Sequence, residues 1–316
     1  MSPNSWTCLH PSNATEAKLS LDNRGLAYGD GFFTTMGVID GQILWLDYHQ
    51  QRLVSHAAAL QLQLDSQSLL AMLKTHAKQL QQGMLKLIVT RAEQEVRGYG
   101  YTPNTGGSAC EIWFKSSPMA ITTAQSLPLA NNQFISLQPA ASAICLSSQI
   151  ACLPPPLAGL KSLNRLDNVL ASGELQAIKA KTLAGTIKPS IAEGLLRDMS
   201  GQWVEGTMSN VFYQLVEAPV AKSSNRPHSQ NNSSSNYLSA GQWYTPSMAH
   251  SGVAGVMRQV IIDTLSTSNN PVIIRSLQDE DLLHLSQLFF CNALRGIMPM
   301  SSLRLLSGEV VSFEAI

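Results

Sequence analysis

Charged residues are scarce in this chain. Asp, Glu, Lys and Arg make up 13% of its 316 residues, against about 25% in a typical soluble domain. The 21 basic residues balance the 21 acidic ones, so no net positive field exists to attract nucleic acid or an anionic membrane. Any anion that the chain binds must therefore be held by a few specifically placed groups.

The motifs of several common chemistries are absent as well. The five cysteines are widely spaced and form no CxxC pair, which argues against a zinc site or a disulfide framework and favours reduced thiols in the cytoplasm. No apolar run is long enough to span a membrane, and the N-terminus does not have the pattern of a signal peptide. HExxH, GxSxG, a nucleotide P-loop and a dinucleotide-binding GxGxxG are missing, so the corresponding enzyme classes have no support.

The hydrophobic pattern predicts a mixed α/β chain with two domains. Strands are indicated near residues 84–91, 111–114, 144, 203–204, 211–216 and 288–291, and helices near 47–60 and from about 164 and 255. We expect a small domain at 1–118, a polar, proline-containing linker at 119–132 and a larger domain at 133–316. Residues 221–240 are rich in Ser and Asn and are expected to form a disordered insert.

Local signals refine the first domain. Residues 19–40 are predicted to form a strand, a glycine-rich turn and a second strand, and Asp40–Gly41 is typical of a tight hairpin turn. Asp47 is typical of an N-cap for the helix that follows. One face of that helix is apolar, and a second face carries His49, Arg52 and His56.

Three side chains could carry chemistry, although each also has a structural explanation. Lys161 follows the apolar segment LAGL, where loss of hydration lowers the pKa of a lysine and makes its amine nucleophilic, but a surface lysine at a helix start fits too. Arg52 could clamp a phosphate or be solvated. Glu205 could face a heterocyclic nitrogen or occupy a turn. The helix start SGVAGVMRQ offers backbone N–H groups to a phosphate.

Seven segments, taken in order, resemble the fold-type IV pyridoxal-phosphate enzymes. They are AYGDGFFTT, HQQRL, RGYG, AGLKSLNRLDNVLA, VEGTMSNVF, GVAGVMRQ and FFCNALRGIMPM. The class includes branched-chain aminotransferases, D-amino acid aminotransferases and 4-amino-4-deoxychorismate lyases, and the lysine segment and CNALRGIMPM look most like the lyases. The resemblance implies an α+β (mixed α/β) fold, with a small N-terminal α/β domain and a larger C-terminal domain that has a β-barrel-like core and helices.

The resemblance also implies the cofactor, pyridoxal 5′-phosphate, and the residues that hold it. Lys161 is expected to bond covalently to the cofactor and to move protons, while Glu205 pairs with the pyridine nitrogen. Arg52 is expected to clamp the phosphate. The other residues expected at the cofactor are Val253, Gly255, Val256, Met257, Asn292 and Ala293.

The substrate implied by the resemblance is 4-amino-4-deoxychorismate, which a lyase converts to 4-aminobenzoate and pyruvate in folate biosynthesis. Arg97 and Arg165 could receive its two carboxylates by bidentate hydrogen bonds, although Arg165 could instead form salt bridges with Asp167 or Asp198. The residues expected at the substrate are Tyr28, Phe33, Thr35, Arg97, Tyr99 and Arg165.

Two alternatives remain open from the sequence. One is a pyridoxal-phosphate-dependent D-amino acid or branched-chain aminotransferase, and the other is a non-catalytic protein that binds the cofactor. In each case we expect a cytoplasmic homodimer that uses no metal and binds neither nucleic acid nor membrane.

Overall fold

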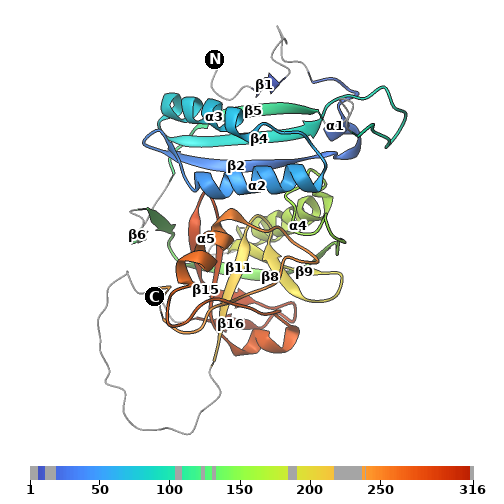
Figure 1. Ribbon diagram of the computed structural model, residues 1–316. Coiled ribbons are helices and arrows are strands. Elements are labelled where there is room, and N and C mark those ends of the chain that lie inside the picture. Colours follow the sequence, from blue (N-terminus) through green and yellow to red (C-terminus); the bar gives the residue numbers. More distant parts are fainter. Residues whose placement is uncertain are drawn as a thin grey trace. The chain divides into compact units, whose positions relative to one another are not determined.

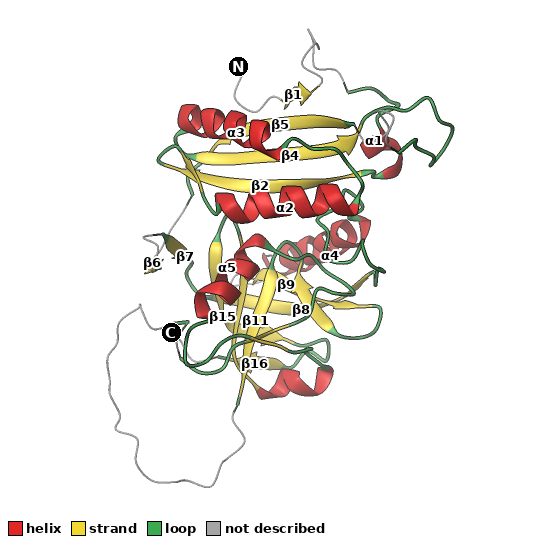
Figure 2. Ribbon diagram, in the orientation of Figure 1, coloured by secondary structure: helices red, strands yellow, loops and turns green. Residues whose placement is uncertain are grey.

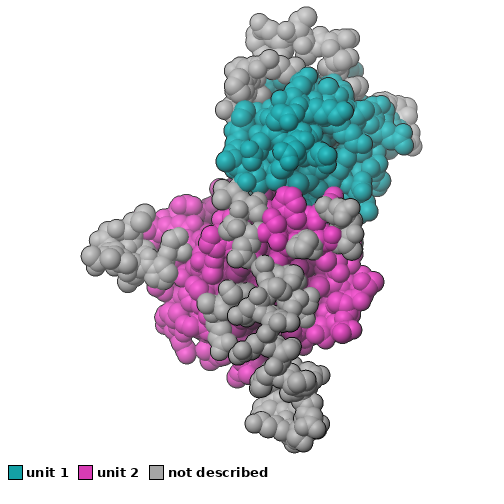
Figure 3. Space-filling view, turned by 90° about the vertical axis from the view of Figure 1, so that its left-hand side faces the viewer, with its two compact units in different colours: residues 1–121, 153–166 teal, residues 122–152, 167–316 magenta. Residues whose placement is uncertain are grey.

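The computed structural model describes residues 6–10, 19–103, 109–121, 125–129, 133–183, 191–216, 237–238 and 240–313. The chain divides into two compact units, one made of residues 1–121 and 153–166 and the other of 122–152 and 167–316, as Figure 3 shows in two colours. The first unit thus includes residues 153–166, which were expected in the second domain. Backbone pairing explains this, because the N–H of Phe33 donates to the carbonyl of Lys161 and the N–H of Leu163 to that of Gly31.

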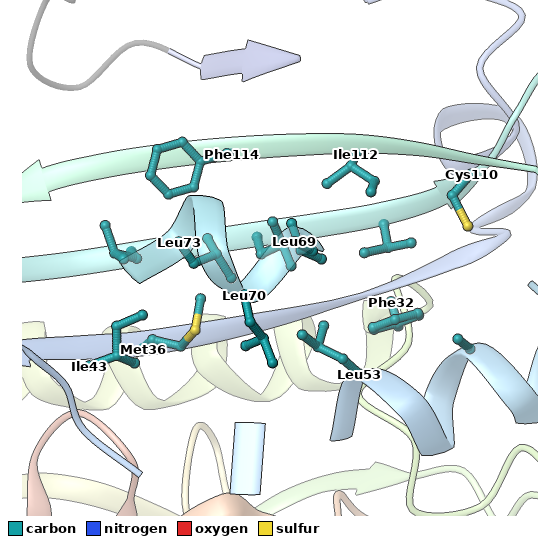
Figure 4. Close-up of a cluster of buried hydrophobic side chains, with 14 of the residues drawn as sticks. Phe32, Met36, Ile43, Leu53, Leu69, Leu70, Leu73, Cys110, Ile112 and Phe114 are labelled. Atoms are coloured by element: carbon teal, nitrogen blue, oxygen red, sulfur yellow. The ribbon is translucent and has the colours of Figure 1, made fainter. Parts of the chain in front are cut away.

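A five-stranded antiparallel sheet forms the first unit, in the order β1–β5–β4–β2–β3. The strands are β1 (Trp6–His10), β2 (Gly31–Ile39), β3 (Gln42–Ile43), β4 (Gly83–Arg91) and β5 (Cys110–Pro118). Two helices, α2 (Leu46–Ala59) and α3 (Ser66–Leu80), cover one face of the sheet (Figure 2). Phe32 and Met36 of β2 point to that face and are fully buried with Leu53 and Leu73 of the helices (Figure 4).

The predicted hairpin turn is confirmed, and the predicted helix cap is not. Asp40 and Gly41 have φ values of 51° and 70°, the left-handed pair that a tight turn between twisted strands requires. The N-cap of α2 is Trp45, whose backbone lies in the left-handed region at φ 58°. Asp47 therefore lies in the first turn of α2, where its charge interacts favourably with the helix dipole, and does not cap the helix.

The strand expected at the start of residues 19–40 is instead a short helix, α1 (Arg24–Tyr28). The side chain of Asn23 accepts a hydrogen bond from the N–H of Leu26 and caps this helix. Gly29 ends it at φ 65°, a conformation that favours glycine. The helix directs the chain into β2 at Gly31.

The second unit is built on a closed ring of strands. Its strands are β6 (Gln125–Pro128), β7 (Phe134–Leu137), β8 (Ala141–Ile150), β9 (Ile191–Asp198), β10 (Trp203–Gly206), β11 (Asn210–Leu215), β12 (Tyr244–Thr245), β13 (Ile273–Ile274), β14 (Leu285–Asn292), β15 (Gly296–Arg304) and β16 (Val310–Ser312). Hydrogen-bonded pairing runs β11–β10–β9–β8–β15–β14 and returns to β11, which confirms the barrel-like core.

Helices pack against this ring within the second unit (Figure 1). Ala171 and Leu175 of α4 (Leu166–Leu183) are buried against Ile144 and Leu146 of β8. The helix α5 (Val256–Leu265) packs against β14, and a 3-10 helix, η2 (Asp279–His284), precedes β14. Strands β10 and β14 both pair with β11. The loop before α5 is hydrogen-bonded to Glu205 of β10, so these three parts of the second unit lie close together.

Two regions expected to lack regular structure have different outcomes. Part of the predicted linker at 119–132 is a strand, because β6 pairs with β7 and buries Leu127. The predicted insert at 221–240 lies outside the described residues, except for Tyr237, Leu238 and Ala240. Within the described ranges, every helix is too short or too polar to cross a lipid bilayer.

Candidate active site

The backbone of Lys161 is held by hydrogen bonds on both sides. Its carbonyl accepts the N–H of Phe33 at 3.0 Å, and its own N–H donates to Nε2 of His56 at 2.9 Å. Ser162 forms an isolated antiparallel bridge with Phe32. The backbone of the segment that carries Lys161 is therefore hydrogen-bonded alongside β2, through one isolated bridge.

The side chain of Lys161 lies against an aromatic ring. Its Nζ is 4.6 Å from the centroid of the Phe33 ring, a distance at which an ammonium group is attracted to the ring face. Nζ of Lys86 lies 5.4 Å from the same centroid. Thr35 pairs directly opposite Lys86 in the β2–β4 register, so Phe33, Thr35 and Lys86 share the sheet face that α2 and α3 do not cover.

Lys86 was not among the residues expected from the sequence. It lies within the apolar strand segment LKLIV. A single lysine among apolar residues in a strand was the signal that could have identified it. Its direct partner across the β4–β5 pair is Lys115. Like charges directly opposite one another destabilise a sheet, and a bound anion would offset that repulsion.

Positive charge also gathers around the buried polar face of α2. Burial and the charge of Arg165 lower the pKa of Arg52 to about 10, and Arg52 donates to Oγ1 of Thr34 at 3.5 Å. Burial, then the charges of Arg52, Arg165 and Lys161, lower the pKa of His56 to about 3. The pKa of His49 is lowered to about 3 by burial and Arg52. The histidines are therefore neutral, and the arginines and Lys161 supply the charge.

Arg165 supports the lysine segment directly. Its guanidinium Nη2 donates to the carbonyl of Leu160, in the peptide group that precedes Lys161. The carboxylates of Asp167 and Asp198, which were considered as its salt-bridge partners, accept hydrogen bonds from other groups. Asp167 accepts the N–H groups of Ala151 and Asn168, and Asp198 accepts from Ser200, Gln202 and Ser251.

The loop RGYG is fastened by an arginine from α1. Arg24 donates to the carbonyls of Gly98, Tyr99 and Gly100 at 3.3, 3.1 and 3.0 Å, respectively. Its Nε also pairs with Asp30 at 2.9 Å. The rings of Tyr28 and Tyr99 meet edge to face with centroids 5.2 Å apart. The structure thus brings these two expected substrate residues together, with Arg97 exposed in the same loop.

In the second unit, Glu205 is buried on β10 and its carboxylate is oriented by two donors. Oε2 accepts the N–H of Val253 at 2.8 Å, and Oε1 accepts the side-chain amide of Asn168 at 3.4 Å. A Cβ on Gly252 would lie 3.0 Å from Oε2, and its φ of 75° favours glycine. The structure therefore brings together Glu205 and Val253, two of the residues that were expected at the cofactor.

Asn210 braces the loop that leads into α5. Its side-chain amide donates to the carbonyl of Val253 at 2.8 Å, and a Cβ on Gly255 would lie only 1.8 Å from Asn210 Oδ1. Gly255 is the N-cap of α5 and has no side chain to bond the first N–H groups of the helix, which point out from the helix start. Val256 and Met257 begin this helix.

The pairing register places these groups beside the end of β14. Asn210 lies opposite Glu205 on one side and Cys291 on the other. Asn292 is the last residue of β14 and Ala293 follows it in the turn before β15, where Oδ1 of Asn292 accepts the N–H groups of Leu294 and Arg295. The sequence missed Asn168 and Asn210, although both lie inside the motifs LNRLDNVLA and VEGTMSNVF.

The described residues contain no group of three His, Cys, Asp or Glu side chains that could hold a metal ion. They offer instead two sets of groups, one in each unit. The first unit carries Lys161, Arg52, Arg165 and Lys86, and the second carries Glu205 with the donors at the start of α5.

A family model described as amino-transferase class IV matches residues 31–303. The chain belongs to the class IV aminotransferase family. It is 23% identical to an aminodeoxychorismate lyase of Vibrio harveyi, over 91% of this chain and 88% of that protein. It is 27% identical to a putative branched-chain-amino-acid aminotransferase of Methanocaldococcus jannaschii, over 95% and 87%, respectively.

Among solved structures, the chain is similar to 4-amino-4-deoxychorismate lyase from Pseudomonas aeruginosa. The TM-score is 0.70 at 29% identity, with 95% of this chain and 92% of that chain covered. A branched-chain amino acid aminotransferase of Escherichia coli has the same fold, with a TM-score of 0.64 at 18% identity over 91% and 82% of the two chains. The class IV members thus share the fold-type IV architecture expected from the sequence.

Proposed function

We propose that this protein is an aminodeoxychorismate lyase, which converts 4-amino-4-deoxychorismate to 4-aminobenzoate and pyruvate in folate biosynthesis. The observation that carries the proposal is the sheet face beside Lys161. Its amine lies over Phe33, and Thr35 and Lys86 share that face. A substrate with two carboxylates needs cations near the reacting amine, and Lys86 meets this need.

The residues present fit pyridoxal 5′-phosphate, the cofactor that family membership indicates. Arg52, whose pKa burial and Arg165 lower to about 10, is a buried cation that a phosphate dianion would stabilise. The uncapped start of α5 offers backbone N–H groups to the same kind of anion. Glu205, oriented by Val253 and Asn168, is the acceptor that a protonated pyridine nitrogen requires.

When bound, the cofactor supplies an electron sink for the carbanion formed at the amine-bearing carbon of the substrate. Glu205 holds the proton on the ring nitrogen through its negative charge. Lys161 removes the proton from the amine-bearing carbon and then returns a proton to the enolpyruvyl group, which leaves as pyruvate. The substrate ring becomes aromatic as the bond between the ring carbon and the oxygen of the enolpyruvyl group breaks, so no oxidant or keto acid is consumed.

Substrate carboxylates are assigned to Lys86 and to the RGYG loop. Lys86 stands next to Phe33 and Thr35 within the first unit. Arg97 presents its guanidinium on a loop that Arg24 fastens through three carbonyls. A planar guanidinium can bind a carboxylate through two parallel hydrogen bonds. We also propose a cytoplasmic homodimer, in line with the family resemblance.

A second candidate is a branched-chain or D-amino acid aminotransferase. The relative from Methanocaldococcus jannaschii favours it at 27% identity. The same lysine and carboxylate would serve that reaction, but the enzyme would need a keto acid to complete its cycle.

One experiment separates the two activities. Purified protein, pyridoxal phosphate and 4-amino-4-deoxychorismate are mixed without any keto acid, and 4-aminobenzoate and pyruvate are measured. Equal release of both products over many turnovers is expected from the lyase. If neither appears while D- or L-amino acids change the absorbance of the bound cofactor, the lyase assignment is overturned in favour of an aminotransferase.

A further inference from the structure

Side chains form hydrogen bonds with both the carbonyl and the N–H of the peptide group that joins Leu160 to Lys161. Its carbonyl, from Leu160, accepts a hydrogen bond from Arg165. Its N–H, from Lys161, donates to Nε2 of His56 at 2.9 Å. Because Phe33 also binds the next carbonyl at 3.0 Å, the main chain on each side of the Lys161 side chain has a defined partner.

A chain of hydrogen bonds assigns the proton on His56. Ser55 Oγ donates to the carbonyl of Arg52 at 3.2 Å, so its lone pairs face Nδ1 of His56, also at 3.2 Å. An imidazole nitrogen that accepts the N–H of Lys161 carries no proton. The proton of neutral His56 is therefore on Nδ1, donated to Ser55, and Nε2 is the bare acceptor.

The surroundings of His56 keep this arrangement in place. The ring packs edge to face on the buried Phe32, with centroids 5.4 Å apart and an interplanar angle of 67°. Burial, and then the charges of Arg52, Arg165 and Lys161, lower the pKa of His56 and so oppose a positive charge on the ring. A protonated imidazole would turn a second N–H toward the N–H of Lys161 and break the contact.

We propose that His56 is a positioning residue for Lys161, a role that rests on the proposed function of Lys161 as the cofactor-bearing lysine. The bare Nε2 of His56 anchors the Lys161 N–H, which sets the direction in which the lysine side chain leaves the β2 edge. His56 itself neither gives nor takes a proton during the reaction. A side chain that offered no acceptor here would leave the lysine able to rotate away from its working position.

The proton assignment can be tested on the full chain, with or without the cofactor. Long-range ¹H–¹⁵N correlation spectra of histidine-labelled protein distinguish the two nitrogens of each of the seven histidines. His56, assigned by its loss in His56→Gln, is expected to carry a protonated Nδ1 and a bare Nε2. A protonated Nε2 on His56 at neutral pH would overturn the proposal.

Two variants of similar size test the positioning role. His56→Gln keeps an acceptor that can reach the Lys161 N–H, whereas His56→Leu removes it. We expect His56→Leu to lower kcat about 100-fold, the loss associated with a misplaced reacting group, with little change in KM and faster hydrogen exchange at the Lys161 amide. His56→Gln is expected to recover kcat to within about tenfold of the natural enzyme and to protect that amide.

The outcomes separate this role from simple packing and from the proposed function. Equal losses in His56→Gln and His56→Leu, with equal amide exchange, would mean that His56 only fills space and would overturn the proposal. Full activity in His56→Leu would do the same. A failure of the lyase assay in the natural protein counts against the proposed function alone, because the proton assignment and the Lys161 exchange are measured without turnover.

Discussion

The two units hold their charged groups by different physical means. In the first unit, Arg52 and the neutral His49 and His56 are buried together, and desolvation is the main cause of their lowered pKa values. In the second, Glu205 is buried but receives hydrogen bonds from a backbone N–H and an amide. The first unit is therefore primed for an anion, while the second presents a carboxylate that is already oriented. The first unit is the cationic half and the second the anionic half, so removal of a charge from each tests them separately.

Removal of the Lys161 amine tests the cationic half most severely. Lys161→Ala is expected to lower turnover at least about 1,000-fold, because both proton transfers of the proposed mechanism use this amine. The contacts of its main chain with His56 and Phe33 are kept, so the thermal unfolding curve is expected to change little. Normal turnover by this variant would remove Lys161 from the mechanism.

Neutralisation of Glu205 tests the anionic half. Glu205→Gln can still accept the N–H of Val253, but it cannot hold a proton on a pyridine nitrogen by charge. We expect kcat to fall about 100-fold, comparable to the loss of one preorganised electrostatic group, with little loss of stability.

Glu193 is the matched control for Glu205. Its carboxylate is also buried, but it accepts from Thr207 and Ser209 in the adjacent turn. Glu193→Gln is expected to cost about 1–3 kcal/mol of unfolding free energy, measured in urea, with a smaller fall in kcat. If the two variants lost kcat equally, the role proposed for Glu205 would be contradicted.

Substitution of Lys86 tests whether the sheet face that α2 and α3 do not cover binds a substrate carboxylate. Lys86→Met removes the charge beside Phe33 and is expected to raise KM about 10- to 100-fold, since a charged hydrogen bond contributes roughly 1.5–3 kcal/mol. Lys115→Met, which removes the charge directly opposite Lys86, serves as the control and should have a smaller effect on KM. A larger effect on KM from Lys115→Met would contradict the assignment to Lys86 and would place the carboxylate site nearer Lys115.

The buried histidines predict an acid limit for the stability of the first unit. Their pKa values are about 3 in the folded protein and about 6.5 when unfolded. The unfolded state therefore binds more protons between these values, and the unfolding free energy falls as pH drops below about 6.5. Each histidine contributes roughly 1.4 kcal/mol per pH unit, so His56→Gln is expected to flatten the slope between pH 6 and 4 in urea titrations. An unchanged slope would show that His56 is not held neutral.

Strong local patterns made part of the fold predictable. The hairpin at Asp40–Gly41 follows from residues that tolerate positive φ, and the buried stripe of α2 follows from helical spacing. The helix α1 was missed, because the hydrogen bond that the Asn23 side chain accepts from the N–H of Leu26 stabilises a helix where a strand was expected. Local spacing could not predict that residues 153–166 belong to the first unit, since this depends on pairing with β2 across more than 100 residues.

The order of the motifs along the chain was enough to predict the family, the cofactor and the candidates Lys161, Glu205 and Arg52, because these depend on residue types in a fixed order. Only the tertiary structure decided that His56 and Arg165 hold the Lys161 backbone and that Lys86 shares a sheet face with Phe33. The physical reason is distance along the chain. Lys161 and His56 meet across 105 residues, and no local periodicity encodes a contact that burial and strand pairing create.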